Sequence, residues 1–139
     1  MEDPDTRVIL RTHRAFAVVG LSPKPHRDSH IVARFLQEHG YRIIPVHPGV
    51  DSILGEKCYP ALGEIPEEVE VVDIFRRSDA VPPVVDDAIA VGAKVVWMQL
   101  GVIHEGAAEK ARRAGLQVVM DRCPLIEYRR HFGNSPRPT

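Results

Sequence analysis

The sequence predicts a three-layer α/β fold: a Rossmann-like, doubly wound parallel sheet in a single domain. Three observations predict it. Apolar runs of strand length recur along the 139 residues, amphipathic stretches of helical length separate them, and the connections are short. Strands that are apolar throughout are typical of a parallel sheet covered by helices on both faces. Right-handed crossovers then place the carboxyl ends of all strands at one edge of the sheet.

The chain is expected to open with a short helix that continues to residue 14. Its N-cap is either Asp3 or Asp5, whose carboxylates suit the free amides of a first helical turn. The apolar residues expected to face the core are Val8, Ile9 and Leu10.

Residues 15–20, AFAVVG, form the first strand and end on the only glycine between residues 15 and 39. Ser29 is the expected N-cap of a helix over residues 30–39, and Gly40 ends that helix. A second strand follows over residues 41–46. This strand, turn, helix and strand make half of a nucleotide-binding fold.

The second half of the chain repeats the alternation of strands and helices. Its expected elements are a short strand at 57–59, a helical turn at 61–64, a strand at 69–75, a helix capped by Ser78 or Asp79 and stopped at Gly92, a strand at 94–100, a helix at 105–114 ended by Gly115, and a strand at 116–120. Residues 1–133 are expected to form the domain, and residues 134–139 a flexible tail.

Composition excludes several classes of function. The net charge is −1, with 18 basic and 19 acidic residues, so neither a general nucleic-acid surface nor an anionic-membrane surface is expected. Two cysteines, Cys58 and Cys123, are too few for a disulfide framework and lack the spacing of a zinc clip. The first residues show no secretory signal, and the longest apolar region, 88–103, falls short of a membrane span. We therefore expect a cytoplasmic protein with no metal site.

The ligand site is expected where the order of the strands reverses, between the loops at 22–29 and 75–78. The amide groups and positive dipole of a helix start suit a phosphate there, with Lys24, His26 and Arg27 beside it and His47 at the end of the second strand. A dinucleotide site is disfavoured, because only the first glycine of G-x-G-x-x-G is present and the second strand ends without a carboxylate. The cations favour a ligand with several phosphate groups.

Five segments together resemble a known family. They are VVGLSPKPHRDS at 18–29, YRIIPVHP at 41–48, DIFRRSDAVPPVVDDAI at 73–89, VVWMQLGV at 95–102 and GLQVVMDRCP at 115–124. The chain resembles the small CoA-binding proteins of bacteria, which are similar to the N-terminal domain of the succinyl-CoA synthetase alpha subunit. The resemblance implies that coenzyme A, or an acyl-CoA, is held by its ADP portion.

The resemblance also implies which segments contact which part of the ligand. The turn from Ser22 to Pro25 meets the phosphates, Pro45 to Pro48 the nucleotide, and Gln99 to Gly101 the pantetheine. The synthetase has a lysine where this chain has Val50, and a threonine-glutamate pair where it has Leu100-Gly101. The expected cofactor-binding residues are Gly20, Leu21, Ser22, Pro23, Lys24, Pro25, Arg27, Ser29, Pro45, Val46, His47, Pro48, Phe75, Arg76, Arg77, Ser78, Gln99, Leu100 and Gly101.

No catalytic residue is expected, because the ligase-type domain that carries the synthetase's phosphorylated histidine is not part of this module. The alternative is an enzyme, NAD(P)-linked or CoA-thioester-processing, that uses His104 or Cys123. Against it, His104 is better explained as a helix start and Cys123 as a structural thiol. A third possibility, a regulatory protein that reports the level of CoA or acyl-CoA to a partner, is left open, and no partner is identified. The remaining histidines, His13, His39 and His131, are expected at the surface without partners.

Overall fold

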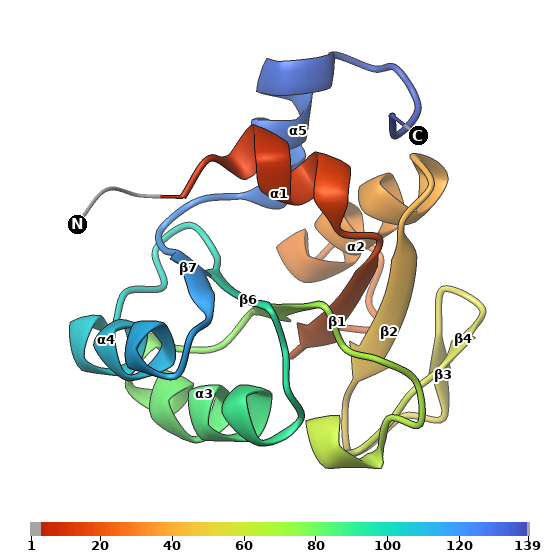
Figure 1. Ribbon diagram of the computed structural model, residues 1–139. Helices are drawn as coiled ribbons and strands as arrows, with labels where there is room; N and C mark the ends of the chain where they lie inside the picture. The colour runs from red at the N-terminus through yellow and green to blue at the C-terminus, as the bar shows by residue number, and fades with distance from the viewer. Residues whose placement is uncertain (1–3, 139) are drawn as a thin grey trace.

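A computed structural model describes residues 4–138 and contains a five-stranded parallel sheet between two layers of helices (Figure 1). The sheet strands are β1 (Ala15–Val19), β2 (Arg42–Val46), β5 (Val71–Ile74), β6 (Val95–Met98) and β7 (Gln117–Val119). The helices are α1 (Thr6–Thr12), α2 (Asp28–Glu38), α3 (Val81–Ala90), α4 (Glu105–Arg113) and α5 (Pro124–Phe132). A small antiparallel hairpin, β3 (Ser52–Ile53) and β4 (Glu56–Lys57), and two 3₁₀ turns, Leu62–Glu64 and Ser78–Ala80, complete the elements.

The strand order is β2-β1-β5-β6-β7, and all neighbouring pairs in this sheet are parallel. Consecutive connections therefore run outward in opposite directions from β1 and β5, which makes the ends of these two strands the switch point. The predicted Rossmann-like α/β class is confirmed. Among residues 4–138, no helix has the length and apolar character needed to cross a membrane.

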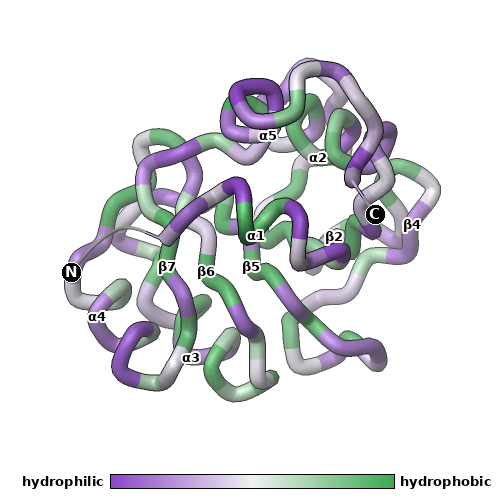
Figure 2. Tube along the Cα trace, turned by 45° about the horizontal axis from the view of Figure 1, so that its top comes forward, coloured by the Kyte–Doolittle hydropathy of each residue, from purple (hydrophilic) through white to green (hydrophobic). Residues whose placement is uncertain are grey.

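Helices α3 and α4 cover one face of the sheet, and α1, α2 and α5 cover the other (Figure 1). Alternate residues of each strand point to opposite faces of the sheet. Val72 and Val96 pack on the α3 and α4 side, whereas Phe16 and Trp97 pack on the opposite side. Figure 2 shows the hydrophobic stretches of the chain gathered along the central strands, as burial on both faces requires.

The leading helix is shorter than expected, and one of its core residues was predicted wrongly. Asp5 caps α1, its carboxylate accepting a hydrogen bond from the Arg7 amide at 2.9 Å, whereas Asp3 lies outside the described residues. Ile9 is buried, as is Leu10, but Val8 is 42% exposed. A helix of seven residues buries only one stripe, and Val8 lies outside it.

Two serines predicted as helix caps have other partners. Helix α2 begins at Asp28, ahead of Ser29, and the Ser29 hydroxyl accepts a hydrogen bond from the Ser22 amide at 3.0 Å. Neither Ser78 nor Asp79 caps α3, because both lie in the 3₁₀ turn before it. The Ser78 hydroxyl instead accepts from the Ile103 amide at 3.0 Å.

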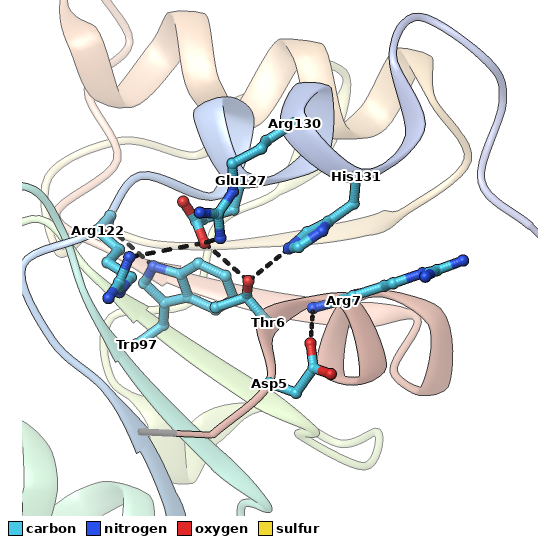
Figure 3. Close-up of polar contacts among 8 residues, drawn as sticks. All are labelled: Asp5, Thr6, Arg7, Trp97, Arg122, Glu127, Arg130 and His131. Carbon is cyan, nitrogen blue, oxygen red and sulfur yellow. Dashed lines mark hydrogen bonds and ion pairs between the residues drawn. The ribbon is translucent and has the colours of Figure 1, made fainter. Parts of the chain in front are cut away.

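Helix α5 was not predicted, and a buried polar network fixes it to the rest of the fold (Figure 3). The Glu127 carboxylate accepts from the Thr6 hydroxyl of α1 at 2.7 Å and from Arg130 at 2.8 Å. The expectation that His131 lacks a partner is wrong, since its Nε2 lies 2.8 Å from the same hydroxyl. The loop that enters α5 is fixed as well, because the Trp97 indole donates to the Arg122 carbonyl at 2.9 Å.

The other two histidines and the end of the chain are also packed. His13 pairs with Glu70 at 3.3 Å, and the His39 ring stacks on Phe35 with centroids 4.0 Å apart. The tail, residues 134–139, was expected to be flexible; in its described part, residues 134–138, Arg137 contacts the body of the domain. The Arg137 amide donates to the His39 carbonyl at 2.8 Å, and its guanidinium lies over the Tyr41 ring.

Gly20 allows the two strands of the switch point to come together. Its φ is +88°, and a Cβ built on it would lie 2.2 Å from the Phe75 carbonyl oxygen. Two non-bonded atoms cannot lie this close. The Phe75 oxygen belongs to the backbone, so it cannot move aside as the end of a flexible side chain could. The site therefore requires glycine both for its dihedral and for its lack of a side chain.

Gly20→Ala is expected to lower the free energy of unfolding by about 3 kcal/mol or more, because the clash forces β1 and β5 apart. Gly92→Ala is the matched control, since Gly92 has a φ of +75° with nothing within 4 Å of a built Cβ. It is expected to cost only about 1–2 kcal/mol, the strain of the dihedral alone. Urea unfolding of both variants measures the difference, and equal losses would show that the close approach carries no cost.

Asp73 is a carboxylic acid inside the sheet. It lies on β5 opposite Val18 and Trp97, and is fully buried. Its Oδ1 accepts a hydrogen bond from Gln99 Nε2, whereas its Oδ2 has no partner among the described residues. Burial raises the pKa of Asp73 to about 7, and the hydrogen bond from Gln99 offsets part of the rise.

This raised pKa predicts a fall in stability as the pH rises. Between the unfolded pKa, about 3.9, and the folded pKa, about 7, the native state holds a proton that the unfolded state has released. Asp73→Asn, which is uncharged and nearly isosteric, is expected to match the wild type near pH 4 and to be more stable by on the order of 3–4 kcal/mol at pH 8. Urea unfolding across this pH range measures it. A constant difference between the two proteins would contradict the assignment.

Candidate functional site

A cleft of about 1260 Å³ opens at the carboxyl edge of the sheet, above the switch point. Loops that follow β1, β2, β5 and β6 line it, together with the starts of α2 and α5. This is the place where open α/β sheets bind their ligands. The cleft therefore brings together segments that lie more than 100 residues apart in the sequence.

The loop from residue 20 to residue 29 forms one wall and is held closed by its own polar groups. The Ser22 amide donates to the Ser29 hydroxyl, and the Ser22 carbonyl lies 3.0 Å from Nδ1 of His30. In contrast, the amides of His26, Asp28 and Ser29 donate to no acceptor within the described residues. The wall thus presents free backbone donors at the start of α2, where the helix dipole favours an anion.

Several cations reach the cleft without an internal partner. Lys24, Arg27 and Arg76 all line it, and their side chains pair with no acidic group in the part of the chain that the structure describes. Arg77 differs, because its guanidinium lies 3.4 Å from the Asp79 carboxylate. The cleft also holds one acid, Asp28, in the first turn of α2.

Polar groups line the floor between β5 and α5. Gln99 reaches the cleft while remaining 4% exposed, and it is bonded to the buried Asp73. Cys123, the N-cap of α5, lines the same floor. Burial raises the pKa of the Cys123 thiol, with smaller contributions that include the negative charge of Asp73, so the thiol is protonated at neutral pH.

The remaining side of the cleft is apolar and open to solvent. Ile31, Leu100 and Ile126 are 47%, 62% and 52% exposed, and Val102 and Leu125 lie beside them. Large exposed apolar side chains that gather around one cleft are typical of a binding surface. The cleft therefore has a cationic side near α2 and the loop after β5, and an apolar side near α5 and the loop after β6.

The cleft brings together thirteen of the nineteen residues predicted as cofactor-binding. They are Gly20, Ser22, Pro23, Lys24, Arg27, Ser29, His47, Pro48, Phe75, Arg76, Arg77, Gln99 and Leu100. Six others do not line it. Leu21, Pro45 and Val46 are buried, Pro25 faces a separate shallow depression, and Ser78 and Gly101 are bonded to each other beside the cleft.

Sequence reasoning missed seven of the residues that line the cleft. They are Asp28, Ile31, Val32, Val50, Val102, Leu125 and Ile126. The last two belong to α5, for which Pro124 at the first helical position was the available signal. Ile31 lies on α2 and is 47% exposed at the cleft.

The two residues proposed for an enzymatic alternative have different positions. His104 caps α4, its Nδ1 accepting from the Ala107 amide at 3.0 Å, and it does not line the cleft. This confirms the expected helix-start role. Cys123 does line the cleft, although its raised pKa disfavours a thiolate nucleophile.

Comparison with solved structures gives the same fold in other proteins. A hypothetical protein from Pyrococcus horikoshii OT3 is 44% identical, with a TM-score of 0.91 over 96% of this chain and 94% of its own. The dinucleotide forming acetyl-coenzyme A synthetase 1 of Ca. Korarchaeum cryptofilum, in complex with phosphate and ADP, is 27% identical with a TM-score of 0.71. The match covers 84% of this chain and 27% of that one.

Sequence comparison finds two kinds of relatives. The uncharacterized protein YneT of Bacillus subtilis is 39% identical over 92% of this chain and 97% of its own length. The ADP-forming acetate–CoA ligase II of Archaeoglobus fulgidus is 33% identical over 79% of this chain, but this chain spans only 17% of that enzyme. The family model described as CoA binding domain matches residues 14–129. The chain therefore belongs to the CoA-binding domain family.

Proposed function

We propose that this protein binds coenzyme A, or an acyl thioester of it, through the ADP portion of the ligand. The observation that carries the proposal is the set of unpaired cations, Lys24, Arg27 and Arg76, in the cleft at the switch point. A surface cation with no acidic neighbour adds little to the stability of the fold. A bound phosphate gives such a cation a charge-assisted hydrogen bond. Membership of the CoA-binding family agrees with a ligand of this kind.

The pyrophosphate is proposed to lie against the loop at residues 22–29. The free amides of His26, Asp28 and Ser29 supply donors there, and Lys24 and Arg27 supply positive charge. Asp28 opposes an anion at the same place, so net attraction depends on the cations outnumbering it. The phosphate contacts are therefore expected to weaken as salt increases.

The two ends of the ligand are proposed to lie on opposite sides of this loop. His47 and Pro48, after β2, line the nucleotide side, and His47 Nδ1 accepts from the Gly49 amide at 3.0 Å. Gln99 and the apolar residues around Ile126 line the other side, which suits the pantetheine arm. We propose binding without a reaction, because the cleft offers no paired acid and base among its described residues.

Arg27→Ala is expected to weaken CoA binding about tenfold or more, since a hydrogen bond to a charged group is worth about 1.5–3 kcal/mol. Isothermal titration with CoA, 3′-dephospho-CoA, NAD and NADP measures the affinity and the choice of ligand. CoA is expected to bind most tightly. The control is Arg113→Ala, whose exposed guanidinium pairs with Glu109 on α4, far from the cleft, and which is expected to change nothing.

Three outcomes would contradict the proposal. NAD binding more tightly than CoA would reassign the ligand, and equal affinity for CoA and 3′-dephospho-CoA would show that the cations of the cleft do not act on the 3′-phosphate of the CoA ribose. Turnover of a CoA thioester that is lost in Cys123→Ser, with CoA binding intact, would establish the enzymatic alternative.

A further inference from the structure

We infer that Asp73 is a positioning residue that holds the Gln99 side chain with its amide oxygen toward the cleft. The cleft then accepts a hydrogen bond from an N–H or O–H group of its ligand. The inference rests on the proposed function, in which the pantetheine arm of CoA supplies such groups through its amides and hydroxyl.

The backbone around Gln99 is fixed on both sides. Its amide donates to the Ile74 carbonyl at 3.4 Å, and its carbonyl accepts from the Val102 amide at 2.8 Å. Its side chain lines the cleft, with Nε2 donating to Asp73 Oδ1. The Oε1 atom makes no hydrogen bond within residues 4–138, and it is not among the enclosed polar atoms. One end of the amide is thus occupied and the other is available.

The chemistry of Asp73 decides which end is occupied. A carboxylate is only an acceptor, so it selects the NH₂ end of a side-chain amide. When Asp73 is protonated, an O–H on Oδ2, which has no partner among the described residues, leaves Oδ1 accepting from Gln99. Only the ionised carboxylate, which has no donor, enforces the orientation of the amide, so the affinities are compared at pH 8.

The buried Asp73 carboxyl makes the fold less stable than an apolar residue at the same position would. A fully buried carboxyl with one unpaired oxygen and a pKa of about 7 is less favourable than an apolar residue of similar volume. Packing alone therefore does not explain why a carboxyl lies here. Orientation of a side chain at a ligand site does explain it, since binding groups are held by neighbours that lock their rotamers.

The position of Gln99 selects the pantetheine arm over the phosphates. Gln99 follows β6, two strands away from β1 in the sheet, so it lies roughly 10 Å from the phosphate loop. Its neighbours in the cleft are Leu100 and Val102, and none of the unpaired cations is on its loop. An acceptor among apolar side chains suits an amide N–H of a largely apolar arm.

The test compares two ligands on the full chain. Isothermal titration is carried out with CoA and with 3′-phospho-ADP, which has the nucleotide of CoA and lacks the pantetheine arm. Gln99→Leu is expected to weaken CoA binding roughly three- to tenfold, the effect of one hydrogen bond, and to leave 3′-phospho-ADP unchanged. Asp73→Asn is expected to weaken CoA binding in the same direction, because the asparagine amide has both a donor and an acceptor and can pair with either end of the Gln99 amide.

The double variant distinguishes positioning from an independent contact. If Asp73 acts only through Gln99, adding Asp73→Asn to Gln99→Leu has no further effect on CoA affinity. The Asn variant is expected to be at least as stable as the wild type at pH 8, so a loss of affinity there is not a loss of folded protein. Gln99→Met also removes the amide group, and it replaces Gln99→Leu if the leucine variant does not fold.

Three results would overturn the inference. They are unchanged CoA affinity in Gln99→Leu or Gln99→Met, equal loss for both ligands, and additive effects in the double variant. Failure of the wild type to bind either ligand would overturn the proposed function together with this inference. Nucleotide binding that survives while the variants leave CoA affinity unchanged would overturn this inference alone.

Discussion

The geometry of the site depends on one close approach of two backbones. Gly20 and Phe75 meet at the ends of β1 and β5 with no room for a side chain between them, and the Phe75 amide donates to the Val19 carbonyl at 2.9 Å. This contact sets how the loops after β1 and β5 face each other. Lys24 and Arg76, one from each loop, can then act on one anion only because the strands are joined at this point.

Local patterns in the sequence were sufficient to predict the layers and the location of the cleft. Apolar runs indicated β1, β2, β5, β6 and β7, and the alternation of strands and helices implied parallel pairing. Parallel pairing with right-handed crossovers in turn predicted which loops face the ligand. Gly20, Lys24 and Arg27, which line the cleft, were predicted in this way, because all of them lie close to a strand end or a helix start.

Features that depend on distant partners were not predictable in the same way. Ser29 has the side chain of a helix cap, but its hydroxyl is taken by an amide seven residues earlier. Helix α5 is held by a contact between Glu127 and Thr6, 121 residues apart, and no local pattern indicates that contact. Two apolar residues of the cleft, Leu125 and Ile126, were missed for the same reason, since they belong to α5.

The two sides of the cleft differ in the groups that they present to a ligand. On the α5 side, three bonds tie the loop after β7 to β6 and its loop: Trp97 to the Arg122 carbonyl, the Arg122 amide to the Met98 carbonyl at 3.3 Å, and the Gly101 amide to the Asp121 carboxylate at 2.6 Å.

On the side proposed to hold the phosphates, the side chains of Lys24, Arg27 and Arg76 are exposed and have no acidic partner among residues 4–138. Exposed charges on long side chains attract any polyphosphate, whereas an amide oxygen in a defined position beside an apolar wall distinguishes ligands by shape and by donor position. Affinity is therefore expected to come mainly from the loop at residues 22–29, and the choice among nucleotides with different arms from the floor around Gln99.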